Sequence, residues 1–550
     1  MGILMAMRLS GVGAAGLLLA VQAQAQVVPS VPDLPAQFDP GLQREQQERI
    51  LRQQEVEERA RRLEIPALQG EAPEAQQLPS SGERFVLQGI HFNPSVFIEA
   101  STLQAMAADY VGKPISFADI NELLRKLNAL YEEAGQLTAR AVVPPQSVDN
   151  GVLSVVLVEA KVDGFGWEDA PRHVDEAFYH KRIRITPGET LDSPALMAAI
   201  ERFNGTSPGP QVSASLAPGQ RFGTTRVNLH AFEPDRLQWS LFANNYGSEG
   251  TGREQYGGSL TWFSPTGVAD ALNAVIVATE GTEYGSLRYS RPVNRHNGVM
   301  FAEVGTNTMS IERGPFAALN IEGESTTYGV GYDQPWWIDN NWMLLGGIGY
   351  SHQNSESTIE GLQLSEVDID EVILKGQFEY RAAPWYGRYE QRVRQASTDN
   401  AINGESGNYQ LLNGMGYLSR AIKTDYEVVG RLSWQYATKS ESLPSSLQYQ
   451  FGGISSVRGY DSGVIASPQG VTLNLEAYWR INDMFQPFIF LDYGKAMELG
   501  TADVDLQSAG IGLNFNWTRR VSLSVVAANT LEDVTPDQDS GQVLAQLVIR

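Results

Sequence analysis

From about residue 237 to the C-terminus, apolar and polar side chains alternate in segments of about ten residues. The clearest segment is 471–480, where one face carries Val471, Leu473, Leu475, Ala477 and Trp479 and the other carries Thr472, Asn474, Glu476, Tyr478 and Arg480. A membrane β-barrel turns the apolar face to lipid and the polar face to a wet lumen. The length of 236–550 accommodates about 16 antiparallel strands of roughly 9–11 residues. A soluble β-sandwich or propeller, with the apolar face buried, is the alternative.

Residues 84–160 have the mixed pattern of a compact α+β domain. A strand at 84–92 and a short helix at 102–110 precede a longer helix, for which Ser116 and Asp119 form a capping-box variant. Its apolar stripe comprises Ile120, Leu123, Leu124, Leu127, Leu130 and Tyr131, and Gly135 ends it. Two more strands complete the order β-α-α-β-β.

Residues 161–235 resemble a second, looser copy of this domain. A strand near Val162 precedes helices at 175–182 and 194–203, and strands then follow within 211–217 and 224–232. Self-similarity at this period predicts two tandem small domains.

The segment 41–64 is predicted to be a helix that is polar on all sides. Five Glu/Arg pairs are spaced i,i+4 with Glu first, the favoured order: Glu45/Arg49, Glu48/Arg52, Glu55/Arg59, Glu57/Arg61 and Glu58/Arg62. Such a helix belongs in water as a spacer or in a polar lumen. Pro-rich and Gln/Glu-rich stretches flank it, so 26–83 is interpreted as this helix and its linkers.

The N-terminus has the pattern of a cleaved secretory signal, residues 1–25, with Arg8 before a short apolar run and Ala23-Gln24-Ala25 as the cleavage site. The net charge of −23 disfavours nucleic acid as a partner, and the absence of cysteine excludes disulfides and Cys-based metal sites. Together with the alternation, the signal places the chain in or beyond the periplasm.

The glycine-rich loop 451–463 contains Arg458 and lies between two predicted strands. On the strand that starts at 485, alternation turns Ile489 and Leu491 to lipid, and therefore Phe490 and Asp492 to the lumen. If the loop folds inward, Asp492 is a natural counter-charge for Arg458. The alternative is a solvated extracellular loop whose arginine is incidental.

Two motifs give the chain a resemblance to a known family: V-R-G-Y (Val457, Arg458, Gly459, Tyr460) and F-x-D-x-G (Phe490, Asp492, Gly494). This pair of motifs is similar to the signature of the outer-membrane assembly and secretion transporters. Within them the chain resembles the two-partner secretion transporters (TpsB type, ShlB/FhaC/HecB-like), over essentially the whole mature sequence. The L-x-P-G-x-x-x-G run at 216–223 resembles part of a second POTRA domain.

The resemblance implies an architecture: a plug helix, POTRA domains at 84–160 and 161–235, and a 16-stranded barrel at 236–550. Arg458, in loop six, would contact Asp492 on strand thirteen, and the 41–64 helix would plug the pore at rest. Counting back from the C-terminus, strands near 471, 485, 508, 520 and 541 are numbers twelve to sixteen. Barrels of the family usually end in an aromatic residue, whereas this chain ends in Arg550.

The implied function is an outer-membrane pore of a Gram-negative bacterium that binds one large, unfolded TpsA-type exoprotein through periplasmic POTRA domains and secretes it. We expect a monomer surrounded by outer-membrane lipids. An insertase of the same superfamily and a passive porin are the alternatives. An insertase usually carries more periplasmic repeats, and a porin does not need 84–232.

Catalytic chemistry is not expected. Residues 205–209 match G-x-S-x-G, but the residue after Ser207 is Pro208, which has no N–H for an oxyanion hole. The sequence shows no nucleotide-binding loop, metal site or cofactor motif.

Overall fold

The structure is a computed structural model that describes residues 38–61, 67–69, 76–79, 84–498, 500, 502–536 and 538–550. The predicted signal sequence, 1–25, lies outside the described residues. Among those residues, no helix has both the length and the hydropathy needed to cross a membrane.

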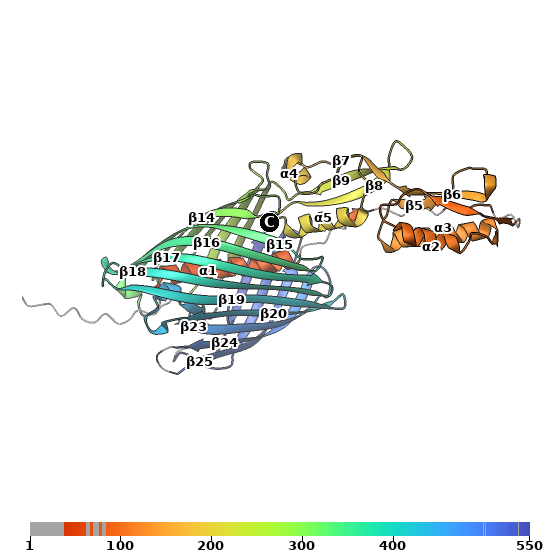
Figure 1. The fold of residues 1–550 in the computed structure, drawn as a ribbon. Coiled ribbons are helices and arrows are strands. Elements are labelled where there is room, and N and C mark those ends of the chain that lie inside the picture. Colours follow the sequence, from red (N-terminus) through yellow and green to blue (C-terminus); the bar gives the residue numbers. More distant parts are fainter. Residues whose placement is uncertain are drawn as a thin grey trace, which may run out of the picture. The chain divides into compact units, whose positions relative to one another are not determined.

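The C-terminal region is a closed antiparallel barrel of sixteen strands, as the sequence predicted (Figure 1). The strands are β10 (Leu237–Asn244), β11 (Gln255–Phe263), β12 (Ala271–Ala278), β13 (Thr282–Pro292), β14 (Val299–Ser310), β15 (Ile321–Trp337), β16 (Trp342–Ile359), β17 (Leu362–Ala382), β18 (Trp385–Asn400), β19 (Ser406–Ile422), β20 (Tyr426–Ala437), β23 (Gln469–Trp479), β24 (Phe485–Met497), β25 (Val504–Asn516), β26 (Val521–Thr530) and β27 (Gly541–Ile549). Pairing of β10 with β27, from Leu241↔Ile549 to Asn244↔Gln546, closes the barrel. The strands β23 to β27 are numbers twelve to sixteen, in agreement with the count from the C-terminus.

The predicted faces of the strands are confirmed. On β24, Ile489 and Leu491 are 62% and 59% exposed, whereas Phe490 and Asp492 are 3% and 4% exposed. An outward face of large apolar side chains suits lipid and not water. The soluble sandwich is therefore wrong, because there the same residues would be buried between sheets.

The first small domain has the predicted order. Strands β3 (Gly89–Phe92), β6 (Val152–Glu159) and β5 (Ala139–Val142) form its sheet in the order β3-β6-β5, against α2 (Ala100–Ala108) and α3 (Phe117–Glu133). Strands β2 (Phe85–Val86) and β4 (Pro114–Ile115) form a short separate pair. The predicted stripe of α3 lies in the core, with Ile120, Leu123, Leu124, Leu127 and Tyr131 buried and Leu130 packed at its edge. Helix α2 begins two residues earlier than predicted, at Ala100, directly after its N-cap Glu99.

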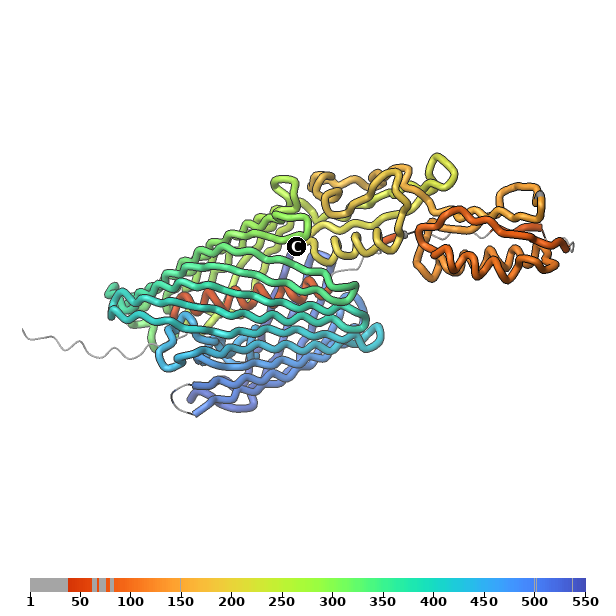
Figure 2. Tube along the Cα trace, viewed as in Figure 1, coloured from red at the N-terminus to blue at the C-terminus, as the bar shows by residue number. Residues whose placement is uncertain are grey.

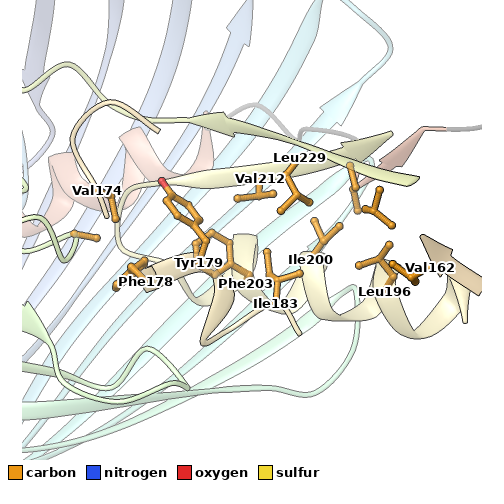
Figure 3. Packing of buried hydrophobic residues seen from close by; sticks show 14 of the residues in the cluster. Val162, Val174, Phe178, Tyr179, Ile183, Leu196, Ile200, Phe203, Val212 and Leu229 are labelled. Atoms are coloured by element: carbon orange, nitrogen blue, oxygen red, sulfur yellow. The ribbon is translucent and has the colours of Figure 1, made fainter. Parts of the chain in front are cut away.

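The second small domain consists of β7 (Lys161–Asp169), α4 (Glu176–His180), α5 (Ser193–Thr206), β8 (Gln211–Pro218) and β9 (Thr224–Phe232). Figure 3 shows its core, where Ile200 and Phe203 of α5 and Tyr179 of α4 pack with Val212 and Leu229 of the sheet. This burial explains why a loosely patterned sequence still forms a compact domain.

A linker segment that the sequence left without structure adds a strand to this sheet. Strand β1 (Leu68–Gln69) pairs in parallel with β8, in the register Leu68↔Ala214 and Gln69↔Ser215, which gives the order β1-β8-β9-β7. A segment of two residues is too short to show an alternation of apolar and polar positions, so the sequence could not predict this strand. It forms because β8 offers an edge to pair with.

Helix α1 (Pro40–Ala60) lies inside the barrel, where Figure 2 shows it in red, running through the lumen. Its side chains hydrogen-bond residues of β16, β17, β18 and β20. The expectation of a polar lumen as its surroundings is confirmed over the described part of 41–64. The helix ends at Ala60, four residues before the predicted end.

Candidate functional site: the loop-six motif and the helix in the lumen

The loop that follows β21 (Tyr449–Phe451) folds into the barrel and returns to β22 (Ile465–Ser467). Its motif residues are deeply buried, with Arg458 4% exposed and Val457 and Tyr460 fully covered. Gly459 has φ +94°, a backbone conformation that residues with a Cβ rarely adopt. The loop is therefore not a solvated surface loop.

The Arg458 guanidinium binds Asp492 through two parallel contacts. Nη2 lies 2.6 Å from Oδ1 and Nε 2.7 Å from Oδ2, and the backbone N–H of Arg458 donates to Oδ2 at 3.1 Å. The guanidinium also lies over the Phe490 ring, 3.7 Å from its centroid. This two-point geometry is the strong form of an arginine–carboxylate contact.

The remaining motif residues complete the fit between loop and wall. A Cβ on Gly494 would lie 2.7 Å from the Cγ2 atom of Val457, so a glycine is required for the valine to pack there. The Tyr460 hydroxyl lies 2.8 Å from the carbonyl oxygen of Glu532 and accepts the N–H of Gln507 at 3.0 Å. Six of the seven motif residues thus contact the other motif or the adjoining barrel wall. Gly459 contributes its positive φ and also lies close to β26, where an added Cβ would be 3.3 Å from Cγ2 of Thr530.

A second carboxylate lies beside Arg458. Oε1 of Glu476 accepts from Nη1 of Arg458 at 2.6 Å, and its Oε2 contacts Nη1 of Arg431 at 2.5 Å. Buried charges of one sign are costly unless opposite charges accompany them. Asp492, Arg458, Glu476 and Arg431 alternate in sign, so two negative and two positive charges balance where loop six meets the wall.

Sequence reasoning assigned neither Glu476 nor Arg431 to the site. The alternation predicts that Glu476 lies on the polar face of its strand, which is confirmed, but it does not predict which residue Glu476 contacts there. Arg431 lies opposite Asn474 on the neighbouring strand, so only the register of β20 against β23 brings it to Glu476. Both residues could have been identified by looking for charged residues on the polar faces of the strands that precede the motif strand β24.

Helix α1 adds charged groups to the same lumen. Oε1 of Glu57 lies 2.7 Å from Nη2 of Arg431, Oε1 of Glu45 lies 3.1 Å from Nη1 of Arg394, and Nε of Arg59 lies 2.8 Å from Oε2 of Glu379. Neutral groups also bind it: Arg49 donates to the carbonyl of Gln450 at 3.0 Å.

The predicted salt bridges within the helix are only partly right among the described residues, and the pair Glu58/Arg62 lies outside them because Arg62 is not described. Glu48/Arg52 and Glu57/Arg61 contact one another at 3.4 and 3.9 Å. Glu45, Arg49 and Arg59 instead reach partners on the barrel, because a lumen offers fixed, desolvated partners that a solvent-exposed helix lacks.

No feature of the described chain indicates catalysis or metal binding. Ser207 is 1% exposed and follows the end of α5, so it is not a presented nucleophile. Within the described ranges, no group of three or more His, Asp or Glu side chains is arranged to hold a metal ion.

Comparison with protein families matches residues 223–515 to the model of the haemolysin secretion/activation protein ShlB/FhaC/HecB. The chain belongs to this family. Residues 85–160 match the ShlB-type POTRA domain, which is the first small domain described above.

Relatives among characterised proteins extend over most of the chain. The hemolysin transporter protein ShlB of Serratia marcescens is 24% identical, over 86% of this chain and 87% of its own length. The outer membrane transporter CdiB of Dickeya dadantii is 24% identical, over 81% and 80%. The heme/hemopexin transporter protein HuxB of Haemophilus influenzae is 20% identical, over 80% and 82%.

Solved structures share the fold. CdiB from Escherichia coli superimposes with a TM-score of 0.65 and 18% identity, over 92% of this chain and 98% of its own. BamA from Haemophilus ducreyi, lacking POTRA domains 1–3, gives a TM-score of 0.53 and 12% identity, over 85% of this chain and all of its own.

Family membership identifies the protein as an outer-membrane transporter of two-partner secretion with periplasmic POTRA domains. It secretes a TpsA-type exoprotein, and the insertase alternative is not supported.

Proposed function

We propose that export depends on three parts of this chain: a latch formed by loop six, a plug formed by α1, and cargo docking on the small domains. The latch comprises Val457, Arg458, Gly459 and Tyr460 of the loop and Phe490, Asp492 and Gly494 of the wall. The buried two-point contact between Arg458 and Asp492 is the observation that carries the proposal.

The proposed division of the chain follows these parts. Residues 1–25 are the signal peptide, 26–83 the plug helix and linker, 84–160 and 161–235 the two POTRA domains, and 236–550 the barrel. No step requires a catalytic group or a nucleotide. Net outward movement of the cargo comes from its folding at the cell surface.

The latch is tested by secretion from cells that carry the cargo. Arg458→Ala and Asp492→Ala should each reduce secretion at least tenfold, because each removes the two-point contact that holds loop six against β24. Arg458→Ala also leaves the buried Asp492 carboxylate without its arginine, and Asp492→Ala leaves Arg458 with only Glu476, which Arg431 shares. Arg313→Ala, which removes a half-exposed arginine, is the matched control and should secrete normally. Unchanged secretion by Arg458→Ala, at normal barrel levels in the outer membrane, would refute the latch.

The plug is tested by conductance in planar bilayers. Deletion of residues 40–60 should raise the current through single channels, because the helix lies in the lumen. An unchanged current would remove the plug from the proposal.

Cargo docking is proposed to use strand addition, in which an extended segment forms main-chain hydrogen bonds with a sheet edge. The β8 edge is occupied by Leu68–Gln69, so the cargo gains that edge only after β1 has left. Because the chain has no cysteine, Leu68→Cys with Ala214→Cys would lock β1 in place. We expect the disulfide to reduce secretion of the cargo and a reductant to restore it, whereas Leu68→Cys alone should secrete at the normal level. Normal secretion with the disulfide formed would exclude the β8 edge as the docking site.

A further inference from the structure

Three charged residues of α1 each contact an ion pair that the barrel wall already contains. Glu45 meets Arg394, which is also bound by Glu371; Glu57 meets Arg431, which is also bound by Glu476. Arg59 meets Glu379, which Arg381 also contacts at 3.3 Å. In each case the helix adds one charge to a pair that is neutral without it.

This arrangement makes α1 a removable ligand. When a buried ion pair loses one member, an uncompensated charge remains, at a cost of about 3–5 kcal/mol. Departure of α1 leaves no such charge at these three points, because Arg394, Arg431 and Glu379 keep their wall partners. The Arg458–Asp492 contact does not involve the helix, so this ion pair keeps both partners after the departure, although loop six loses the hydrogen bonds that Gln46 and Gln53 donate to it.

The two arginines keep N–H groups directed at the vacated space. In Arg394, Nε and Nη2 are engaged by Glu371 at 3.0 and 3.1 Å, and Nη1 faces Glu45. In Arg431, Nη1 is engaged by Glu476, and Nε and Nη2 together face Glu57 at 3.2 and 2.7 Å. Arg431 thus presents a two-donor edge that matches a carboxylate, whereas Arg394 presents the single Nη1 group.

The spacing of the two arginines also suits an extended chain. Glu45 and Glu57 are about 18 Å apart along the helix at 1.5 Å per residue. An extended strand covers the same distance in about five or six residues at roughly 3.3 Å per residue.

We propose that Arg394 and Arg431 form a two-point binding surface for an acidic chain segment, which α1 occupies at rest and carboxylates of the passing cargo occupy during export. The second half of this statement rests on the proposed function. The chemistry selected is a chain with carboxylates about six residues apart when extended.

The test measures block of channel current by added peptides, so its outcome is separate from that of the secretion assays. The full-length variant Glu45→Gln/Glu57→Gln, whose helix is weakened at both arginines, is placed in planar bilayers. A synthetic peptide of residues 38–61 should block its current. For the same peptide with Glu57→Gln, the concentration that blocks half of the current should be at least tenfold higher. The peptide with Glu55→Gln, a substitution at an exposed position, should block at the same concentration as the parent peptide.

The cargo half is tested with an extended, unstructured dodecapeptide that carries two glutamates six residues apart, against its glutamine analogue. The glutamate peptide should block at least fivefold more strongly, and Arg431→Gln in the channel should remove the difference. If Arg431→Gln does not assemble, Arg431→Lys, which keeps the charge and loses the planar edge, should reduce the difference.

Equal block by the Glu57→Gln and Glu55→Gln peptides, or no block by the parent peptide, would overturn the binding surface. Equal block by the glutamate and glutamine dodecapeptides would overturn its use by cargo.

Discussion

At the residue scale, the two motifs are one interlocking contact. Phe490, Asp492 and Gly494 share the inward face of β24, and they supply a ring, a carboxylate and an empty space to Arg458 and Val457. The ion pair loses solvation on burial, which offsets much of its attraction. We therefore propose that its main effect is to favour one position of the loop.

Gly494→Ala tests the space between the motifs. The new methyl group would lie within 2.7 Å of Val457, and such overpacking typically costs about 1–3 kcal/mol. We expect the loop to leave its seat more often, measured as faster trypsin cleavage after the buried Arg458. Adding Val457→Ala should restore slow cleavage relative to Gly494→Ala alone. Additive effects of the two substitutions would show that they do not share this space.

At the element scale, α1 is a polar helix that the lumen supplies with fixed partners. Its charged side chains reach wall partners on several strands, and few of its residues are apolar, with Leu42 and Val56 among those buried. Asp39 caps its N-terminus, accepting the N–H groups of Gly41 and Leu42 at 2.8 and 3.1 Å. The same carboxylate accepts the hydroxyls of Ser445 and Ser446, so the cap also attaches the helix to the barrel.

Asp39→Ala should loosen the plug. Loss of an N-cap costs about 1 kcal/mol, and the hydroxyl contacts are lost with it. We expect faster hydrogen exchange at the first turn of α1 and more frequent channel opening. Asp39→Asn, which retains a capping oxygen, should lie near the wild type; if both substitutions behave alike, the cap is not what holds this end.

Asp119 makes the first small domain sensitive to acid. Its carboxylate accepts the backbone N–H of Ser116 at 2.7 Å and the hydroxyl at 2.8 Å, and these hydrogen bonds lower the pKa of Asp119. A lowered pKa means stabilisation that is present above the unfolded pKa of about 4 and is lost as pH falls below it. Protection of α3 amides from hydrogen exchange should drop over this range. In Asp119→Asn the drop should be smaller, and an identical profile in both proteins would exclude this carboxylate as the cause.

At the scale of the whole molecule, the alternation of apolar and polar residues along each strand separates the lipid-facing surface of the barrel from its lumen. Ile489 and Gln486 lie on the same strand, but the first is 62% exposed on the outer face and the second points to the lumen side. The barrel is closed by only a short pairing of β10 with β27, so its stability rests mainly on the longer ladders and on the lipid-facing surface.

Ile489→Arg should therefore destabilise the barrel, by about 2–4 kcal/mol if it lies near the bilayer midplane. The measurement is the urea midpoint of folding into lipid vesicles. Gln486→Arg, the matched substitution on the opposite face, should shift the midpoint much less. Equal shifts would contradict the assignment of the two faces.

Much of this architecture is readable in the chain because it depends on local periodicity. Strand alternation predicts which side of β23 and β24 meets lipid, since successive side chains of a strand point to opposite faces. The core stripe and cap of α3 are readable for the same reason, at helical spacing. The uniformly polar pattern of α1 predicts wet surroundings but not which strands surround it.

The pairing of groups in the lumen was decided by tertiary structure. Glu57, Arg431 and Glu476 lie far apart along the chain and meet only through barrel closure, strand register and the depth at which α1 lies. Strand β1 is likewise too short to carry a period and exists because β8 offers an edge. Periodicity tells each residue which side it faces, whereas the partner it finds there depends on distances that only the closed fold sets.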